Sequence, residues 1–272
     1  MAALLMGSAS GATKSATAVL PSLDHLRMED YDNVYEPAED TYLMCDALLQ
    51  DRPFILAQPP RLVLEIGSGS GCNITYLTSL INAASDVDAD GEGDTSEPLP
   101  GCVSIATDIN PYAVSCTERT AAANNCSNIQ VVQTDLITGL EDTHGVAGAV
   151  DVLVFNPPYV PTPDEEVGTA DVAAAWAGGK DGRRVIDRFL PLLPLLLTKP
   201  TSTTADTETE IWTETEVKGG GRCYLVLVEE NKPAEIAQQL RRVGLLGEIV
   251  LRRRARNEGL LIMRITWLEV QV

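Results

Sequence analysis

The stretch Val63-Leu64-Glu65-Ile66-Gly67-Ser68-Gly69-Ser70-Gly71 decides how this chain folds. Its first half is an apolar run of strand length. The glycines that follow at every second position let the backbone turn and approach a ligand closely, where a Cβ would clash. Residues 72–81 then have the apolar spacing of a helix. The stretch predicts a ligand-binding turn between a strand and a helix, with a glycine turn that binds nothing as the alternative.

Apolar runs of strand length alternate with helix-like patterns along the rest of the chain. We predict strands at 61–66, 102–107, 129–133, 151–155, 222–228, 247–251 and 260–267. We predict helices at 38–49, 72–81, 111–124, 183–197 and 233–243. Pro111 and Pro233 suit first turns, with Asn110 or Asp108 and Asn231 as caps. The alternation indicates an α/β fold with a mostly parallel sheet covered on both faces, closed by a hairpin of the last two strands.

Two acidic segments and the N-terminus are expected to lie outside the core. Residues 84–100 contain six acids and no base, and residues 199–220 contain five acids and two bases. Such segments cannot bury enough apolar surface to offset the entropy of ordering, so both are predicted to be solvated loops. We expect a flexible N-terminus over residues 1–30 and a single domain over residues 31–272.

Composition excludes several classes of protein. No apolar run approaches the ~18 to 20 residues that a bilayer requires. The formal net charge of -19 disfavours a surface that wraps duplex nucleic acid, although Arg252, Arg253, Arg254 and Arg256 form one basic run. The six scattered cysteines indicate reduced, buried thiols in an intracellular protein, in the cytoplasm or in the cytoplasm and nucleus. With only two histidines, we expect no metal site.

Acidic residues follow two further predicted strands. Asp108 ends the second strand, where a carboxylate can accept hydrogen bonds from both hydroxyls of a ribose. This position fits NAD and S-adenosylmethionine equally well, and a helix cap is the structural alternative. Asp135 follows the third strand, where it could accept a hydrogen bond from the exocyclic amine of adenine. A dinucleotide-binding turn would require Gly or Ala where Cys72 stands. The glycine turn, preceded by an acid, resembles instead the first motif of class I S-adenosylmethionine-dependent methyltransferases.

The motif that carries the chemistry is Asn156-Pro157-Pro158-Tyr159, directly after the strand 151–155. An amide nitrogen is a poor nucleophile because its lone pair is delocalised into the carbonyl. The Asn156 side-chain oxygen and the Pro157 carbonyl can each accept one N–H of a planar NH2 group and align its nitrogen with a methyl donor. Pro158 keeps Pro157 extended, and the Tyr159 ring can stack on the flat group. A proline-rich turn without chemistry is the alternative.

Several motifs recur in an order that resembles one known family. They are residues 34–41 (VYEPAEDT), the glycine turn, residues 107–111 (TDINP), residues 156–159 and residues 175–183 (AWAGGKDGR). Together they resemble the eukaryotic and archaeal, HemK2-like branch of the HemK-type glutamine methyltransferases, which modify the Gly-Gly-Gln glutamine of class I translation termination factors at N5. The resemblance spans about residues 33–268 and implies the class I methyltransferase fold, a Rossmann-like, seven-stranded and mostly parallel sheet.

The resemblance also implies roles for individual residues. S-adenosylmethionine, which leaves as S-adenosylhomocysteine, would contact Thr41, Glu65, Gly67, Gly69, Asp108, Asp135, Leu136 and Asn156. The substrate glutamine would be held by Asn156, Pro157, Pro158 and Tyr159, of which Asn156, Pro157 and Tyr159 would be catalytic. A small zinc-binding activator subunit would complete a heterodimer, and the edge strand 129–133 is where we expect it to dock.

Other functions remain open from the sequence alone. The same Asn-Pro-Pro-Tyr chemistry serves the N6 amine of adenine, so a DNA methyltransferase is one alternative. A protein lysine methyltransferase is another, although a lysine amine needs no clamp for an amide. A scaffold that binds the cofactor without catalysis is the alternative outside the enzymes. The acidic charge and the intact motif at 156–159 favour glutamine methylation.

Overall fold

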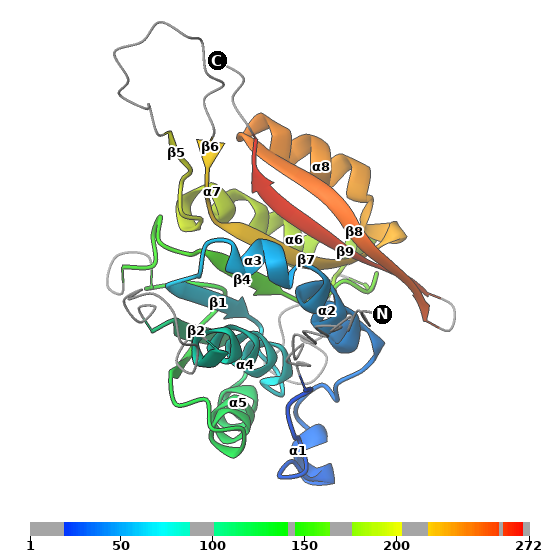
Figure 1. The fold of residues 1–272 in the computed structure, drawn as a ribbon. Coiled ribbons are helices and arrows are strands. Elements are labelled where there is room, and N and C mark those ends of the chain that lie inside the picture. Colours follow the sequence, from blue (N-terminus) through cyan, green and yellow to red (C-terminus); the bar gives the residue numbers. More distant parts are fainter. Residues whose placement is uncertain are drawn as a thin grey trace, which may run out of the picture.

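The computed structural model describes residues 19–87, 101–140, 145–163, 176–202, 217–255 and 258–268. Figure 1 shows a twisted sheet with helices on both sides. The sheet has seven strands in the order β3-β2-β1-β4-β7-β9-β8. β9 runs in the opposite direction to the other six strands of this sheet. This is the mostly parallel sheet with a closing antiparallel hairpin that the sequence predicts for a class I methyltransferase, and the fold-class prediction is confirmed.

The seven predicted strands are present, with small differences at their ends. They are β1 (Leu62–Ile66), β2 (Val103–Asp108), β3 (Ile129–Gln133), β4 (Val152–Phe155), β7 (Arg222–Val228), β8 (Leu245–Ala255) and β9 (Glu258–Trp267). β7 is buried at every position, as a strand between two layers of helices must be. Because β1, β2, β3, β4 and β7 are parallel, their carboxyl ends meet at one edge of the sheet.

The two faces of the sheet are covered by different helices. One face carries α2 (Glu39–Gln50), α4 (Cys72–Val87) and α5 (Pro111–Ala123), and the other carries α6 (Arg184–Phe189), α7 (Leu193–Leu196) and α8 (Pro233–Arg242). Two short helices, α1 (Met28–Tyr31) and α3 (Arg52–Leu56), were not predicted. Within the ranges that the structure describes, no helix is long and apolar enough to cross a membrane.

Two helix predictions need correction. The helix predicted at 183–197 is broken into α6, a 3-10 turn at Leu190–Leu192 and α7, because Pro191 and Pro194 cannot donate the backbone hydrogen bonds of a continuous helix. Asn231 does not cap α8: the residue before the helix is Lys232, in a left-handed conformation, and Asn231 bonds elsewhere. Asn110 does cap α5, because its side chain accepts a hydrogen bond from Tyr112 N at 2.9 Å.

The regions expected outside the core are partly structured. The N-terminal expectation of a flexible segment to residue 30 is too long, because Leu26 is buried against Val34, Ala113 and Cys116. α4 continues to Val87, into the segment predicted as a loop. Inside the second acidic segment, residues near its two ends form a small antiparallel pair, β5 (Thr201–Ser202) and β6 (Val217–Lys218). Residues 1–18, 88–100 and 203–216, which hold the rest of these predictions, lie outside the described residues.

Candidate active site

A cavity opens at the edge of the sheet where β1, β2 and β4 end. Its wall brings together residues that are distant in the sequence and that the sequence analysis singled out: Thr41, Glu65, Gly67, Gly69, Asp108, Asp135, Leu136, Asn156 and Pro158. Pro157 and Tyr159, which were also singled out, are buried and do not line the cavity. Ligands of open α/β sheets bind at the carboxyl ends of the strands, so this cavity is the candidate active site.

The glycine turn between β1 and α4 leaves room for a ligand. Gly69 has a φ of +53°, in the left-handed region that favours glycine. No atom lies within 4 Å of the position that a Cβ would take there. The backbone N–H of Gly69 donates a hydrogen bond of 2.9 Å to Asp108 Oδ2, which ties the turn to the end of β2. The turn therefore presents bare backbone to the cavity in a fixed position.

Asp108 has a structural role and faces the cavity as well. Besides the bond from Gly69, its Oδ1 accepts a hydrogen bond from Asn110 N at 2.9 Å. Burial raises the pKa of Asp108, and these backbone donors oppose the rise. Each carboxylate oxygen has a second lone pair. Asp108 can therefore hold the turn and still accept hydrogen bonds from ligand hydroxyls.

Glu65 is the most deeply buried acid of the cavity wall, with 1% of its surface exposed. Its Oε2 accepts a hydrogen bond from Ile74 N, in the first turn of α4, at 2.9 Å. Burial raises its pKa well above the ordinary value, and the nearby Asp108 adds to the rise. Two carboxyl groups whose charged forms are disfavoured in this way favour a ligand that brings positive charge to them.

Asp135, another acid of the cavity wall, forms an ion pair that the sequence did not predict. Arg188 of α6 forms an ion pair of 2.6 Å with Asp135 Oδ2 across the cavity wall. The next residue, Leu136, has a φ of +54°, and its carbonyl accepts a hydrogen bond from Thr107 Oγ1 at 2.8 Å. A non-glycine residue in this conformation costs free energy and is commonly found at binding sites. The loop after β3 is thus fixed in shape, and one Asp135 oxygen is already engaged.

Asn156 and Tyr159 share one partner, Asp40 of α2. Asn156 Nδ2 and the Tyr159 hydroxyl each donate a hydrogen bond of 3.1 Å to Asp40 Oδ2. The other end of the amide, Asn156 Oδ1, is buried and accepts no hydrogen bond from any described residue. A buried acceptor without a donor costs free energy and needs an explanation. Asn156 lines the cavity, so a donor on a ligand there can supply the missing hydrogen bond.

The loop that carries Asn156 to Tyr159 is locked from behind by the segment 176–183. Val160 and Ala177 form a parallel bridge. Gly182 has a φ of +66°, and a Cβ there would collide with the Tyr159 carbonyl oxygen. Asn231, which is fully buried, donates hydrogen bonds to the carbonyls of Tyr159 at 2.8 Å and Asp181 at 3.0 Å. These backbone contacts explain why the glycine-rich motif 175–183 accompanies the Asn-Pro-Pro-Tyr motif.

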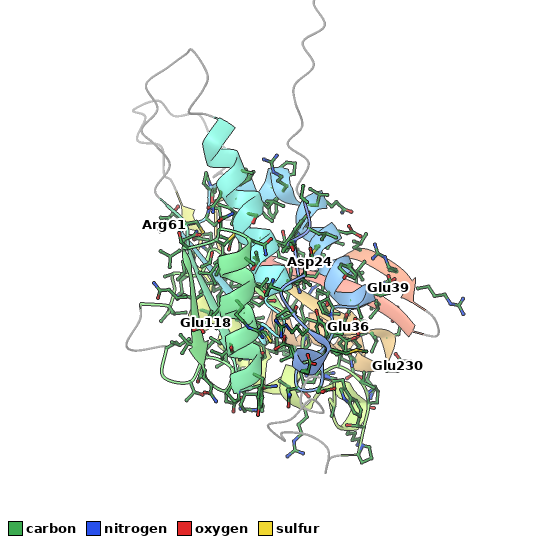
Figure 2. The ribbon with its side chains drawn as sticks, turned by 90° about the horizontal axis from the view of Figure 1, so that it is seen from below. Asp24, Glu36, Glu39, Arg61, Glu118 and Glu230 are labelled. Carbon is green, nitrogen blue, oxygen red and sulfur yellow. The ribbon has the colours of Figure 1, made fainter. Side chains whose placement is uncertain are left out.

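Three acids lie close in the sequence to the start of α2 and to the carboxyl end of β7. Glu36 and Glu39 flank the wall residues at the start of α2, and Glu230 follows the carboxyl end of β7. Figure 2 shows these three side chains on one side of the molecule, whereas Arg61 lies far from them, next to the amino end of β1. Glu39 forms an ion pair with Arg253 at 3.5 Å.

Three residues of the site were not identified from the sequence as site residues. Asp40, Arg188 and Asn231 make their site contacts with partners 116, 53 and 72 residues away in the sequence. Only Asp40 carried a usable signal, because it is an acid next to Thr41 in the motif 34–41 and on a helix that is otherwise apolar toward the core.

Comparisons with known proteins identify the family. No protein-family model matches the chain. The chain is 39% identical over 244 residues to mouse "Methyltransferase HEMK2", which covers 90% of this chain and 94% of the relative. It is 32% identical over 256 residues to the Schizosaccharomyces pombe "eRF1 methyltransferase catalytic subunit mtq2", with coverage of 90% and 94%.

Among solved structures, the chain is similar to the E. cuniculi Mtq2-Trm112 complex, responsible for the methylation of the eRF1 translation termination factor. The identity is 23%, the coverage is 86% of this chain and 98% of that chain, and the TM-score is 0.48. The two sequence relatives match at high coverage of both chains. The chain belongs to the HEMK2/Mtq2 family of methyltransferases.

Proposed function

We propose that the chain methylates the side-chain amide nitrogen, N5, of the glutamine in the Gly-Gly-Gln motif of a class I translation termination factor. The observation that carries this proposal is Asn156 Oδ1, a buried acceptor at the cavity wall that lacks a donor. Leaving such an atom unpaired costs about 1–3 kcal/mol, so a substrate N–H that reaches it is favoured. The name of the S. pombe relative, an eRF1 methyltransferase catalytic subunit, supports a termination factor as the substrate.

The donor set of the cavity fits S-adenosylmethionine. Glu65 and Asp108 offer carboxylates to its ammonium and hydroxyl groups, and Gly69 leaves open space beside them. Asp135 and Leu136 would hold the adenine side, with Thr41 at the start of α2. When bound, S-adenosylmethionine supplies an electrophilic methyl group on a positively charged sulfur, and S-adenosylhomocysteine remains as the product. The buried acids of the cavity wall suit this positive charge.

The chain contributes positioning and electrostatics to the reaction. Asn156 Oδ1, at the cavity wall, would accept one N–H of the glutamine side chain. The motif assigns the second N–H to the Pro157 carbonyl, although Pro157 is buried and does not line the cavity in this structure. The two bonds would fix the plane of the amide and the direction of its nitrogen. The same two oxygens stabilise the positive charge that develops on that nitrogen. No general base is needed before transfer, because the nitrogen loses its proton afterwards. Tyr159 acts through its hydroxyl bond to Asp40 and, in this structure, does not reach the cavity wall.

The alternative methyl acceptors fit less well. The N6 amine of adenine is also a planar NH2 group, but a chain with a net charge of -19 repels a phosphate backbone. A lysine amine needs no clamp for an amide, so it would not require two aligned acceptors. We propose the cytoplasm as the place of action, because termination factors act in translation.

The experiment that tests this function compares wild type with Asn156→Ala. Labelled S-adenosylmethionine is supplied with a termination factor that carries Gln or Ala in its Gly-Gly-Gln loop. We expect the wild type to label only the Gln form, and Asn156→Ala to lose about 10²- to 10³-fold in rate while it still binds S-adenosylmethionine. Near-normal labelling by Asn156→Ala, or equal labelling of the Ala form, would contradict the proposal.

A small zinc-binding activator subunit is the partner that we propose for the heterodimer. β3 is an edge strand, and no strand among the described residues pairs with its outer side. Apolar side chains beside it are exposed, including Ile109 at 42% and Tyr112 at 57%. The relative from S. pombe is named a catalytic subunit, which supports a second chain. An apolar edge of this kind needs to be paired or covered.

A further inference from the structure

Asp40 is placed where it can control the chemistry of Asn156. It is the second residue of α2, only 4% exposed, and it lines the cavity. Its Oδ1 accepts hydrogen bonds from Thr41 N at 2.7 Å and from Thr41 Oγ1 at 3.4 Å. Its Oδ2 accepts the bonds from Asn156 Nδ2 and the Tyr159 hydroxyl, both of 3.1 Å. In all of these contacts the side chain of Asp40 accepts the hydrogen bond.

The polarity of this contact decides which end of the Asn156 amide faces the substrate. A carboxylate accepts hydrogen bonds and cannot donate them, whereas an amide has a donor end and an acceptor end. Beside Asp40, the Asn156 amide must therefore present its NH2 group. Rotating the amide by half a turn would set two oxygens against each other and direct NH2 at the incoming NH2 of the substrate. The Oδ1 that lacks a donor is thus held toward the cavity.

The rest of α2 holds Asp40 in place. Negative charge is favourable in the first turn of a helix, because the backbone N–H groups there are not paired within the helix. Leu43, Met44 and Leu48 of the same helix are fully buried. On the outer side, Arg253 of β8 forms ion pairs with Glu39 and Asp46. The position of Asp40 relative to Asn156 is therefore set by packing and not by the single contact between them.

We propose that Asp40 is a positioning residue that fixes the Asn156 amide in the orientation that accepts a hydrogen bond from the substrate glutamine. Asp40 acts through Asn156 and, by its second bond, through Tyr159. The inference rests on the proposed function, because it assumes a substrate NH2 group at Asn156. It assigns a role to the acid of the motif 34–41 beyond that of its neighbour Thr41 at the cofactor.

The first test replaces the carboxylate by an amide of the same shape. Asp40→Asn can turn its own NH2 group toward Asn156 and so permits the wrong orientation. We expect S-adenosylmethionine binding to change by less than about 3-fold and kcat on a Gly-Gly-Gln substrate to fall by about 10²-fold. Asp46→Asn is the matched control, because it removes an acid from the same helix at an exposed position away from the cavity. A wild-type kcat for Asp40→Asn overturns the inference.

The second test exchanges the two groups. In the double variant Asp40→Asn with Asn156→Asp, the amide at position 40 donates to the carboxylate at position 156, whose other oxygen again accepts from the substrate. A purely structural role of Asp40 predicts that the two defects add. The inference predicts that the double variant is at least about 10-fold more active than Asn156→Asp alone, since it restores one correctly directed acceptor. Activity no higher than that of Asn156→Asp overturns it.

A third measurement needs no variant of Asp40 and covers the case in which Asp40→Asn does not fold. The side-chain NH2 protons of Asn156 are assigned by their loss in Asn156→Ala, and their exchange with solvent is followed in wild type. We expect them to stay protected both with S-adenosylhomocysteine alone and after a Gly-Gly-Gln peptide is added, because they face Asp40. Loss of protection on peptide binding overturns the inference. Failure of wild type to methylate the peptide would instead count against the proposed function.

Discussion

Asp108 combines two roles that sequence reasoning treats as alternatives. It receives backbone N–H bonds from Gly69 and Asn110, and it lines the cavity with further acceptor capacity. Asp108→Ala removes the bonds to the ligand and also releases the glycine turn. We expect S-adenosylmethionine affinity to fall by more than 10²-fold, because charge-assisted hydrogen bonds contribute about 1.5–3 kcal/mol each. Calorimetric titration measures this, and unchanged affinity would place the ribose-binding acid elsewhere.

The raised pKa values of Glu65 and Asp108 predict how binding depends on pH. Burial raises both pKa values, so the free folded protein holds protons that the unfolded chain has already lost. As the pH falls below the folded pKa values of these two acids, their protonation therefore raises the free energy of unfolding. This gain is complete once the pH lies below their pKa in the unfolded chain, about 4. A cationic ligand favours the charged carboxylates. S-adenosylmethionine binding should thus release protons and weaken as the pH falls.

This proton release can be measured without any turnover. Calorimetric titrations in buffers of different ionisation enthalpy give the number of protons released on binding between about pH 5 and pH 8. We expect Glu65→Gln to lower that number. Identical heats in all buffers across this range would show that the two acids are already charged in the free protein.

Residues could be predicted where their role follows from position on a single element. Asp108 and Asn156 end parallel strands, and parallel strands deliver their ends to one edge. Arg188 and Asn231 could not be predicted, because their roles depend on partners on other elements. Asp40 could be singled out as an acid beside Thr41, but its contact with Asn156 could not. Asn231, two residues before Pro233, resembles a helix cap from the sequence, yet its amide donates to carbonyls of the loop after β4 and of the segment 176–183.

At the scale of elements, strands and most helices followed from local patterns, whereas breaks and additions did not. β3 and β7 match their predicted bounds because their apolar runs are ended by polar or glycine residues. The helix predicted at 183–197 has an apolar face but contains two prolines that interrupt it. α4 continues to Val87, although the acidic composition of the segment that begins at residue 84 favours a loop. Composition predicts solvation but not where a helix ends.

The segment 176–183 and the loop after β4 should behave as one unit. Gly182→Ala adds a Cβ against the Tyr159 carbonyl oxygen, at a φ of +66°. Gly148→Ala is the matched control, since Gly148 has a φ of +67° and no atom near its Cβ position. Both variants pay the cost of a left-handed alanine, about 1–2 kcal/mol. Only Gly182→Ala should lose more than this in urea denaturation and also lower kcat. Equal effects of the two variants would show that the close packing has no role.

At the scale of the whole molecule, β3 leaves the sheet open on one side. Ser104 N donates to the Asn128 carbonyl, and Thr134 N donates to the Asp108 carbonyl. Backbone groups of a strand alternate in direction, so Val131, between these residues, directs its N–H and C=O away from β2. The side chain of Val131 is half-buried against the core. What β3 offers a partner is therefore its backbone as well as the apolar side chains around it.

Replacing Val131 by proline separates pairing of the backbone from burial of side chains. Val131→Pro removes one outward N–H, and an edge strand tolerates proline where its N–H is not used by the sheet. We expect the isolated chain to keep its melting temperature within a few degrees and its S-adenosylmethionine affinity, while capture of the activator subunit falls by at least about 10-fold. Val132→Pro is the contrasting variant, because its N–H points toward β2 and its loss should destabilise the chain itself. If Val131→Pro and wild type capture the activator equally, the two chains do not join by extending this sheet, and the exposed Ile109 and Tyr112 become the contacts to test.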